Sequence, residues 1–451
     1  MNNRLPYLTV DLPEDIAKWK AVGEFARAEK LINQRLEKAI PFALKQRLEI
    51  EKELLEVIKA DYSLRYDEAF QLLVDNIYNF THEEFEALID ANAIDWYYID
   101  GDIHFRKNIV RNIYKTHPHI GARSKDSRLI EDWSVLLHDT MVDLKENEQL
   151  IYHIHMRSSF KVKKDSQKPG EIIKVHLPLP IEYAQVENFR IINSSHKPTY
   201  IGEKDAQVRT IYFEKNYEAD EEFFVEYEFD NHVVYQILDP KKVSHSQPTF
   251  YTEELFPHIV FTPYILSVAQ EIVGNETNPL LKARKIYDYV TKNVRYSLVR
   301  SYYAIENIPT YALTNFKGDC GVQTLTFITL CRAVGVPARF QSGLYTNPEF
   351  LGNHDWAQIY IAPFGWLFVD CSFGGTAYYE DDKELWDFYF GNLDPFRMPA
   401  ISNFQHDLIP ELTYTRNDPY TNQNGEAEYI SGKLTNRDVT IKETIIDIFK
   451  K

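Results

Sequence analysis

The chain has 451 residues, and its 50 Lys and Arg against 67 Asp and Glu give a formal net charge of −17 at pH 7. This acidity argues against nucleic acid or an anionic membrane as a partner, because both are bound through clustered cations. Hydrophobic residues make up 44% of the chain, there are three cysteines, and no apolar run reaches the roughly 18 residues that span a bilayer. We therefore expect a cytoplasmic globular protein of about three domains, and not a secreted, disulfide-rich one.

The first 145 residues carry the periodicity of amphipathic helices. Apolar residues recur at helical spacing over Pro13–Ala39 and again over Phe42–Ala60, with charged residues between them. Thr81–Glu84 matches a capping box that begins another helix, and Trp96–Phe105 matches a hairpin that turns on Asp-Gly. The pattern predicts a mainly helical N-terminal domain over residues 1–145.

The hydrophobic period changes from about 3.6 to about 2 residues near Glu148, which indicates that strands replace helices. Turn-forming residues separate the strand-like segments, and the pattern predicts an antiparallel β-sandwich domain over residues 146–245. Its expected strands are Leu150–Val162, Glu171–Leu177, Asn188–Ile192, Val208–Phe213 and Glu222–Phe229.

Helical character returns at Pro263 and leads into a mixed α+β unit, which we place over residues 246–400. The remaining residues, 401–451, are polar and rich in turn formers, and they are expected to form a short C-terminal tail. The predicted fold class is therefore multidomain α+β.

The most informative segment of the third unit is a helix that begins at a cysteine. From Gly321 onward the chain is apolar at helical spacing, and Gly335 followed by Pro337 ends the helix. Cys320 therefore lies at the helix N-terminus, where free backbone N–H groups and the helix dipole favour a thiolate and an oxyanion. A cysteine nucleophile needs both, although a free cysteine is more often a small buried hydrophobe. Cys331 lies about 16 Å further along the helix, so a disulfide with Cys320 is excluded and core packing is expected.

A histidine and an aspartate follow at the same end of a predicted hairpin. His354 stands near the start of one strand, Ala362–Gly365 forms the turn, and the return strand ends at Asp370. Antiparallel pairing brings the two together, and a carboxylate there would hold the imidazole in the tautomer that a general base needs. Asp355 is the alternative partner, but neighbouring strand residues point to opposite faces, which favours Asp370. By the same rule Cys371 faces away from Asp370 and is expected to pack in the core.

These motifs, in this order and spacing, resemble the transglutaminase-like superfamily of papain-fold enzymes. That family has Gly-Asp-Cys at the start of a helix that ends in Arg-Ala-x-Gly-x-Pro-Ala-Arg, then His-x-Trp, then Gly-Trp before a strand that closes in Asp. The resemblance covers about residues 260–395, and the preceding β domain resembles the accessory β domain of bacterial members. The matching segments here are Gly318–Cys320, Arg332–Arg339, His354–Trp356 and Gly365-Trp366 with Asp370.

The resemblance implies that Cys320 is the nucleophile, His354 the general base and acid, and Asp370 the residue that orients the histidine. The implied reaction is acyl transfer from an amide or peptide carbonyl through a thioester. We expect hydrolysis of a peptide or protein substrate, because water needs no second specific binding site. No cofactor is expected, and no metal is implied, because the calcium clusters of the animal enzymes are not apparent in the sequence.

Two alternatives stay open at this point. One is a protein-binding or scaffolding module in which the triad is vestigial, because fold alone does not fix function. The other is protein-glutamine transamidation. Cross-linking animal enzymes carry a tryptophan before the nucleophile, and the nearest one here, Trp133, lies in another predicted domain. The side-chain oxyanion donor is therefore unassigned, and Trp356 is expected to pack beside the histidine strand.

Other candidate features have ordinary structural explanations. His153 and His155 lie on one strand face, and His117 and His119 flank a proline, but neither pair has a third metal ligand that the sequence identifies. Aromatic clusters such as Tyr302-Tyr303 either line a substrate cleft or pack between domains.

Overall fold

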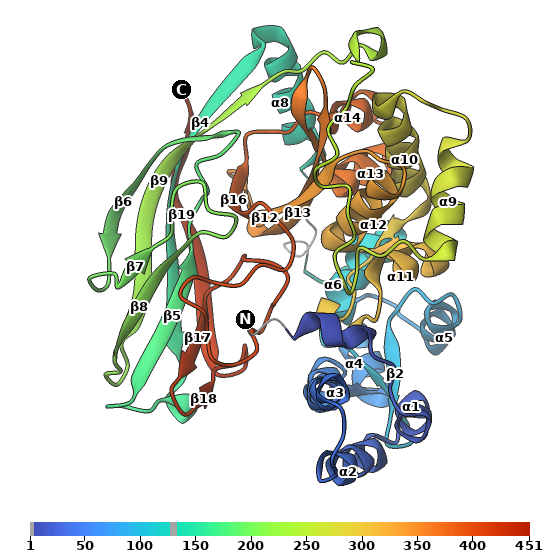
Figure 1. Ribbon diagram of the computed structural model, residues 1–451, viewed down its shortest axis with the longest axis vertical. Helices are drawn as coiled ribbons and strands as arrows, with labels where there is room; N and C mark the ends of the chain where they lie inside the picture. Colours follow the sequence, from blue (N-terminus) through green and yellow to red (C-terminus); the bar gives the residue numbers. More distant parts are fainter. Residues whose placement is uncertain (1–3, 127–132) are drawn as a thin grey trace.

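The computed structural model describes residues 4–126 and 133–451. Figure 1 shows three units: a β-sandwich on one side, a core of helices and a sheet beside it, and a helical N-terminal unit below that core. This combination of helices and antiparallel sheets confirms the predicted multidomain α+β class. Within the described ranges, none of the helices has both the length and the apolar character needed to cross a lipid bilayer.

The N-terminal unit is mainly helical, as the periodicity predicts. Its elements are η1 (Leu5–Thr9), α1 (Glu14–Ala21), α2 (Phe25–Leu36), α3 (Phe42–Asp61), β1 (Leu64–Arg65), α4 (Tyr66–Asn76), α5 (His82–Asp90), β2 (Trp96–Ile99), β3 (Asp102–Phe105), α6 (Ile109–Thr116) and α7 (Pro118–Gly121). The next helix, α8 (Ser134–Asn147), lies apart from these and packs against α14 (Lys383–Phe388) of the core and β4 (Gln149–Val162) of the sandwich (Figure 1). Thr81 caps α5 in the expected capping box with Glu84. The predicted hairpin forms as β2 and β3, and its turn residues Asp100 and Gly101 both have the positive φ that a tight hairpin turn requires.

The β-sandwich packs a four-stranded sheet, in the order β19-β4-β9-β6, against a five-stranded sheet, in the order β18-β17-β5-β8-β7. Its strands are β4 (Gln149–Val162), β5 (Ile172–Pro178), β6 (Val186–Ser194), β7 (Tyr200–Ile201), β8 (Thr210–Asn216), β9 (Glu222–Val234), β17 (Glu426–Tyr429), β18 (Gly432–Lys433) and β19 (Val439–Lys450). Alternate apolar residues of the two sheets meet between them, which is the arrangement that a period of two residues predicts.

The end of the chain differs from the predicted tail. β17 pairs with β5, and β19 pairs with β4 from Val439 opposite Val162 to Lys450 opposite Tyr152. Figure 1 shows these last strands, in red, lying among the green strands of the sandwich. Alternation identifies a strand but not its partner, so the sequence alone does not reveal that the C-terminal residues complete a domain begun much earlier in the chain.

The third unit is a five-stranded antiparallel sheet, in the order β15-β14-β13-β12-β16, with helices packed on it. Its elements are α9 (Pro263–Val273), α10 (Pro279–Asn293), β10 (Arg295–Tyr296), η5 (Tyr302–Ala304), α11 (Ile308–Asn315), β11 (Lys317–Gly318), α12 (Cys320–Ala333), β12 (Ala338–Thr346), β13 (Leu351–Ile361), β14 (Gly365–Val369), α13 (Cys371–Tyr379), α14 (Lys383–Phe388), β15 (Phe390–Gly391) and β16 (Arg397–Ile401). Helix α12 is buried from Gly321 to Arg332 and packs against α10, α11 and β13. A buried helix of this kind holds its first residue in a fixed place relative to the sheet.

The β13–β14 hairpin has the register that the sequence predicts. Ile361 pairs with Gly365 and Ala357 pairs with Val369. Asp370 follows directly, so the chain enters α13 beside the part of β13 that carries His354. The sheet and α12 together therefore determine where the predicted site lies.

Candidate active site

Cys320 is the first residue of α12, as the sequence predicts. Asp319 caps the helix, because its Oδ1 accepts a hydrogen bond from the Val322 N–H at 3.2 Å. The same oxygen accepts a hydrogen bond from the Tyr302 hydroxyl at 2.5 Å. The backbone at the start of the helix is thus fixed by a buried carboxyl group and a tyrosine.

The three cysteines differ in exposure. Cys320 is partly exposed, whereas Cys331 and Cys371 are buried in the main hydrophobic core. The prediction that the latter two pack in the core is therefore confirmed. Cys320 is therefore the most accessible of the three cysteines in the folded protein.

An acidic side chain contacts the Cys320 sulfur. Its Sγ lies 3.6 Å from Asp355 Oδ2. Gly321 is required beside it, because a Cβ at that position would collide with the Tyr302 hydroxyl and the Asp355 carboxyl group. Burial raises the pKa of the Cys320 thiol, and Asp355 and Asp319 raise it further. Burial and the two acidic neighbours therefore oppose the thiolate that the helix dipole favours.

His354 and Asp370 form the predicted pair. His354 Nε2 lies 2.7 Å from Asp370 Oδ2, and both side chains are buried. The imidazole packs against the Phe373 ring at a centroid distance of 4.5 Å, which restricts its orientation. Burial lowers the pKa of His354, while Asp370 raises it. The resting imidazole is thus neutral and able to accept a proton, and Asp370 stabilises the cation that results.

Asp370 is held as an ionised carboxylate by several donors. Arg397 Nη1 donates to its Oδ2 at 2.8 Å, and the N–H groups of Ser372 and Phe373 donate to its Oδ1 at 3.0 and 2.9 Å. Burial by itself raises the pKa of Asp370, but His354 and Arg397 lower it to about 2. A carboxylate with these partners keeps its charge and its position at any pH near neutrality.

Sequence reasoning missed Arg397 and its second partner, Asp394. Arg397 is fully buried and its Nη2 lies 2.6 Å from Asp394 Oδ2, so one arginine bridges two carboxylates. It arrives through the pairing of β16 with β12, which places it near a hairpin that precedes it in the chain. An arginine begins the otherwise apolar segment Arg397–Ile401. Because a buried charge needs a partner, this pattern could have indicated a buried ion pair.

The expected alternation along β13 is confirmed. Asp355 does not pair with His354, and reaches Cys320 instead. Trp356 is fully buried, and its Nε1 donates to Gln341 Oε1 at 2.6 Å, so it packs beside the histidine strand as predicted.

Cys320 and His354 both line one cavity of about 1030 Å³, at the upper end of the range for ligand pockets. Its walls come from the core, from residues between 417 and 423, and from the helical N-terminal unit. Trp133, the residue before α8, also lines the cavity and packs on the core, with its ring 4.4 Å from the Phe350 ring. The tryptophan that sequence distance places in another domain is therefore part of the same cavity. The N-terminal unit also contributes the basic residues Arg106, Arg111 and Lys115.

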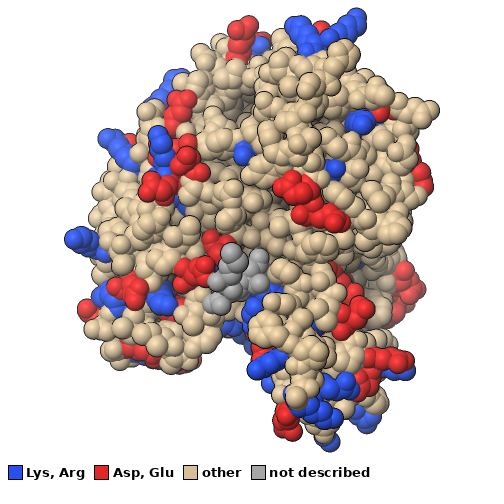
Figure 2. Space-filling model, viewed as in Figure 1, with Lys and Arg blue, Asp and Glu red and all other residues tan. Residues whose placement is uncertain are grey.

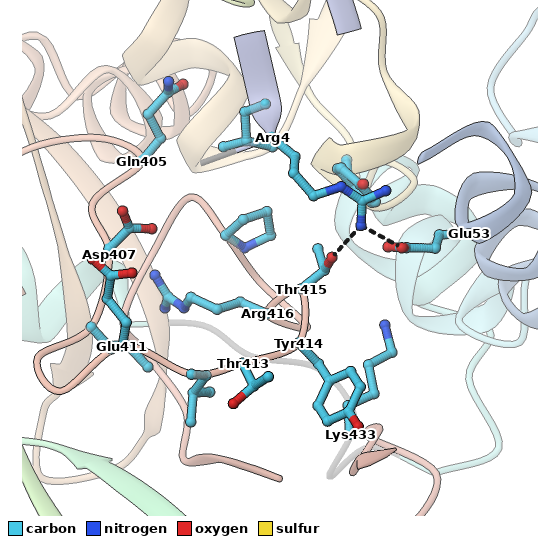
Figure 3. Close-up of a pocket in the computed structure, with 15 residues that line it drawn as sticks. Arg4, Glu53, Gln405, Asp407, Glu411, Thr413, Tyr414, Thr415, Arg416 and Lys433 are labelled. Carbon is cyan, nitrogen blue, oxygen red and sulfur yellow. Dashed lines mark hydrogen bonds and ion pairs between the residues drawn. The ribbon is translucent and has the colours of Figure 1, made fainter. Parts of the chain in front are cut away.

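A smaller pocket of about 350 Å³ adjoins this cavity where the start of the chain meets its C-terminal part (Figure 3). Arg4 crosses the boundary and donates to Glu53 Oε1 at 2.8 Å and to Thr415 Oγ1 at 3.0 Å. Tyr303 and Pro419 line both hollows. The helical unit and the C-terminal part thus form walls of the site that the core does not provide.

The other histidine motifs are engaged in ion pairs or ring contacts. His153 Nδ1 lies 2.9 Å from Asp230, and His155 Nε2 lies 2.9 Å from Glu226. Over residues 4–126 and 133–451, no group of three or more His, Cys, Asp or Glu side chains is arranged to hold a metal ion. On the face drawn in Figure 2, acidic and basic side chains are interspersed.

Comparison with known proteins finds a family match that includes Cys320, His354 and Asp370. Residues 266–371 match the transglutaminase-like superfamily, so the chain contains a transglutaminase-like domain, and the match ends one residue after Asp370. An uncharacterized protein from Haemophilus influenzae (strain ATCC 51907 / DSM 11121 / KW20 / Rd) is 28% identical over 236 residues, which make up 44% of this chain and 62% of that relative. The match thus spans less than two thirds of the relative's length.

Two solved structures share low overall similarity with this chain. One, proposed to be a cysteine protease, comes from Cytophaga hutchinsonii, with 13% identity and a TM-score of 0.39 over 67% of this chain and 90% of that one. The other is the periplasmic domain of TgpA from Pseudomonas aeruginosa, with 13% identity and a TM-score of 0.29 over 54% of this chain and 94% of that one. Scores this low carry no argument about activity.

Proposed function

We propose that this chain is a cysteine-dependent peptidase or amidohydrolase. Cys320 is the nucleophile, His354 moves the proton, and Asp370 orients His354. The observation that carries the proposal is the buried His354–Asp370 pair, 2.7 Å apart, beside a large cavity that a partly exposed cysteine also lines. A peptide or protein substrate is part of this proposal, and a cytoplasmic location stays a prediction.

The chemistry follows from the groups present. Because Nε2 of His354 is engaged with Asp370, Nδ1 is the nitrogen left to take the thiol proton from Cys320. The sulfur then bonds to the amide carbonyl carbon, the C–N bond breaks, and His354 returns the proton to the departing amine. Water attacks the thioester, gives its proton to His354, and the C–S bond breaks to release the acid and restore the thiol. No redox step is involved, so protons and bonds balance within the site.

The alternative of a binding module with a vestigial triad requires a sulfur that substrate does not reach. Cys320 is partly exposed and lines the cavity, and Asp370 is ionised and fully bonded, which favours the enzyme. Transamidation differs from hydrolysis only in the acceptor of the acyl group, so the same experiment distinguishes the two.

The test compares wild type, Cys320→Ala and Cys331→Ala with a peptide library, with and without a small primary amine, by mass spectrometry. We expect wild type and Cys331→Ala to cleave peptides or hydrolyse amides. Cys320→Ala should lose at least about 10³-fold in rate, since it lacks the nucleophile. Incorporation of the amine in place of hydrolysis would indicate transamidation. Activity that survives in Cys320→Ala would refute the proposal.

A further inference from the structure

The Cys320 thiol has an acidic side chain as its partner. Its sulfur lies 3.6 Å from Asp355 Oδ2, and within the part of the chain that the structure describes this carboxyl group, and not the imidazole of His354, is its hydrogen-bond partner. Asp355 is 3% exposed. Asp355 follows His354 on β13, and strand alternation turns its side chain to the opposite face. From that face it reaches the proposed nucleophile, Cys320.

The Asp355 carboxyl group is held in this position by the C-terminal part of the chain. Gln423 Nε2 donates to Asp355 Oδ1 at 2.8 Å and to the carbonyl oxygen of His354 at 3.2 Å. Gln423 is itself 8% exposed and lies between β16 and β17, where the chain returns from the core to the sandwich. Gln423 binds one oxygen of the carboxyl group, and the other oxygen faces Cys320. The orientation of the carboxyl group toward the sulfur is therefore fixed by a second hydrogen bond.

Asp355 and Cys320 are two acids in contact in a buried site. Burial raises the pKa of Asp355 to about 8, and the carboxyl groups of Asp319 and Asp418 act in the same direction. The Tyr302 hydroxyl is bound to Asp319 and its pKa is raised by burial, and Asp370 also raises the pKa of the Cys320 thiol. Two acids this close lose their protons one after the other, because the charge on the first opposes the charge on the second. Asp355 therefore ionises first, with its pKa at about 8, and its charge then raises the pKa of the Cys320 thiol further.

A thiol has one proton and donates it to one acceptor at a time. While Cys320 donates to Asp355, it cannot also pass its proton to His354. We propose, on the basis of the function proposed above, that Asp355 is a catalytic residue that holds the Cys320 thiol protonated in the free enzyme, and that Gln423 positions it. When substrate enters the cavity, the thiol exchanges its hydrogen bond with Asp355 Oδ2 for one with His354. This exchange breaks no covalent bond, and the proton moves only afterwards.

The test is the rate at which iodoacetamide alkylates each cysteine of the full chain from pH 6 to pH 10, followed by mass spectrometry. In Asp355→Asn, Cys320 should react about tenfold faster at pH 8–9, since removing the neighbouring charge lowers the thiol pKa by about one unit. Asp418→Asn is the matched control, because that carboxyl group lies near Asp355 but does not contact the sulfur. It should change the rate less than about twofold.

Labelling of the buried Cys331 and Cys371 would reveal that Asp355→Asn does not fold. In that case a second variant still tests the proposal. Gln423→Leu removes the donor that favours ionised Asp355, so the rise in Cys320 alkylation at pH 8–9 should appear there too. Unchanged or slower alkylation in a folded variant overturns the role of Asp355. The proposed function fails separately, if Cys320→Ala still turns over substrate.

Discussion

Replacement of Asp370 by Asn tests the proposed triad most directly, since it removes one charge and little volume. Asp370 Oδ2 lies 2.7 Å from His354 Nε2 in a fully buried site. With the charge centres about 4 Å apart and an effective dielectric constant of about 20, the carboxylate stabilises the imidazolium by about 4 kcal/mol. Because each 1.36 kcal/mol is tenfold in rate, kcat/KM should fall about 10³-fold.

The assay is the pH dependence of kcat/KM for a peptide that the wild type cleaves. Asp370 raises the pKa of His354 against the effect of burial. In Asp370→Asn the acidic limb of the profile should therefore move to lower pH. Asp394→Asn is the matched control, because it removes the other buried carboxylate that pairs with Arg397 but leaves the histidine pair intact. A loss below tenfold in Asp370→Asn, or equal losses in the two variants, would refute the reasoning.

Three further predictions concern stability and local packing. Gly321→Ala should lower the free energy of unfolding by about 1–3 kcal/mol and kcat/KM by at least tenfold, because its Cβ collides with two polar side chains. Gly432→Ala is the control: it has open space around it and should change neither urea unfolding nor kinetics. Burial raises the pKa of Glu443 to about 8, so wild-type stability falls as pH rises from about 4.5 to 8. Glu443→Gln should gain up to about 4 kcal/mol at pH 8 but little at pH 4, because one pKa unit corresponds to about 1.4 kcal/mol. An equal difference at both pH values would contradict this. Deletion of residues 438–451 should lower Tm by more than about 10 °C, because it uncovers β4, and an unchanged Tm in calorimetry would show a dispensable tail.

The cavity joins parts of the chain that are remote in sequence. Its lining includes Arg106 from the N-terminal unit, Cys320 and His354 from the core, and Gln423 from the C-terminal part. The transglutaminase-like match over residues 266–371 therefore contains the proposed reacting groups but only part of the cavity walls. In the proposed enzyme, a substrate in this cavity would therefore contact the N-terminal unit and the C-terminal part as well as the core.

The local features of the site follow from the sequence because each has a local cause. A helix start at Cys320 is set by the apolar periodicity that follows it, and the pairing of His354 with Asp370 is set by the short turn between their strands. The fold class follows for the same reason, since the change in hydrophobic period marks the change from helices to strands. Each of these inferences needs only residues a few positions apart.

Contacts between distant segments were decided by the tertiary structure alone. The position of Arg397 beside Asp370 depends on how β16 pairs with β12, and the place of β19 depends on its choice of β4 as a partner. The protonation of Cys320 depends on burial and on Asp355, which oppose the local helix dipole. The sequence by itself predicted which residues are candidates for the chemistry and on which elements they lie. Tertiary structure decided their partners and charges, because strand pairing and burial depend on packing between segments that local patterns do not encode.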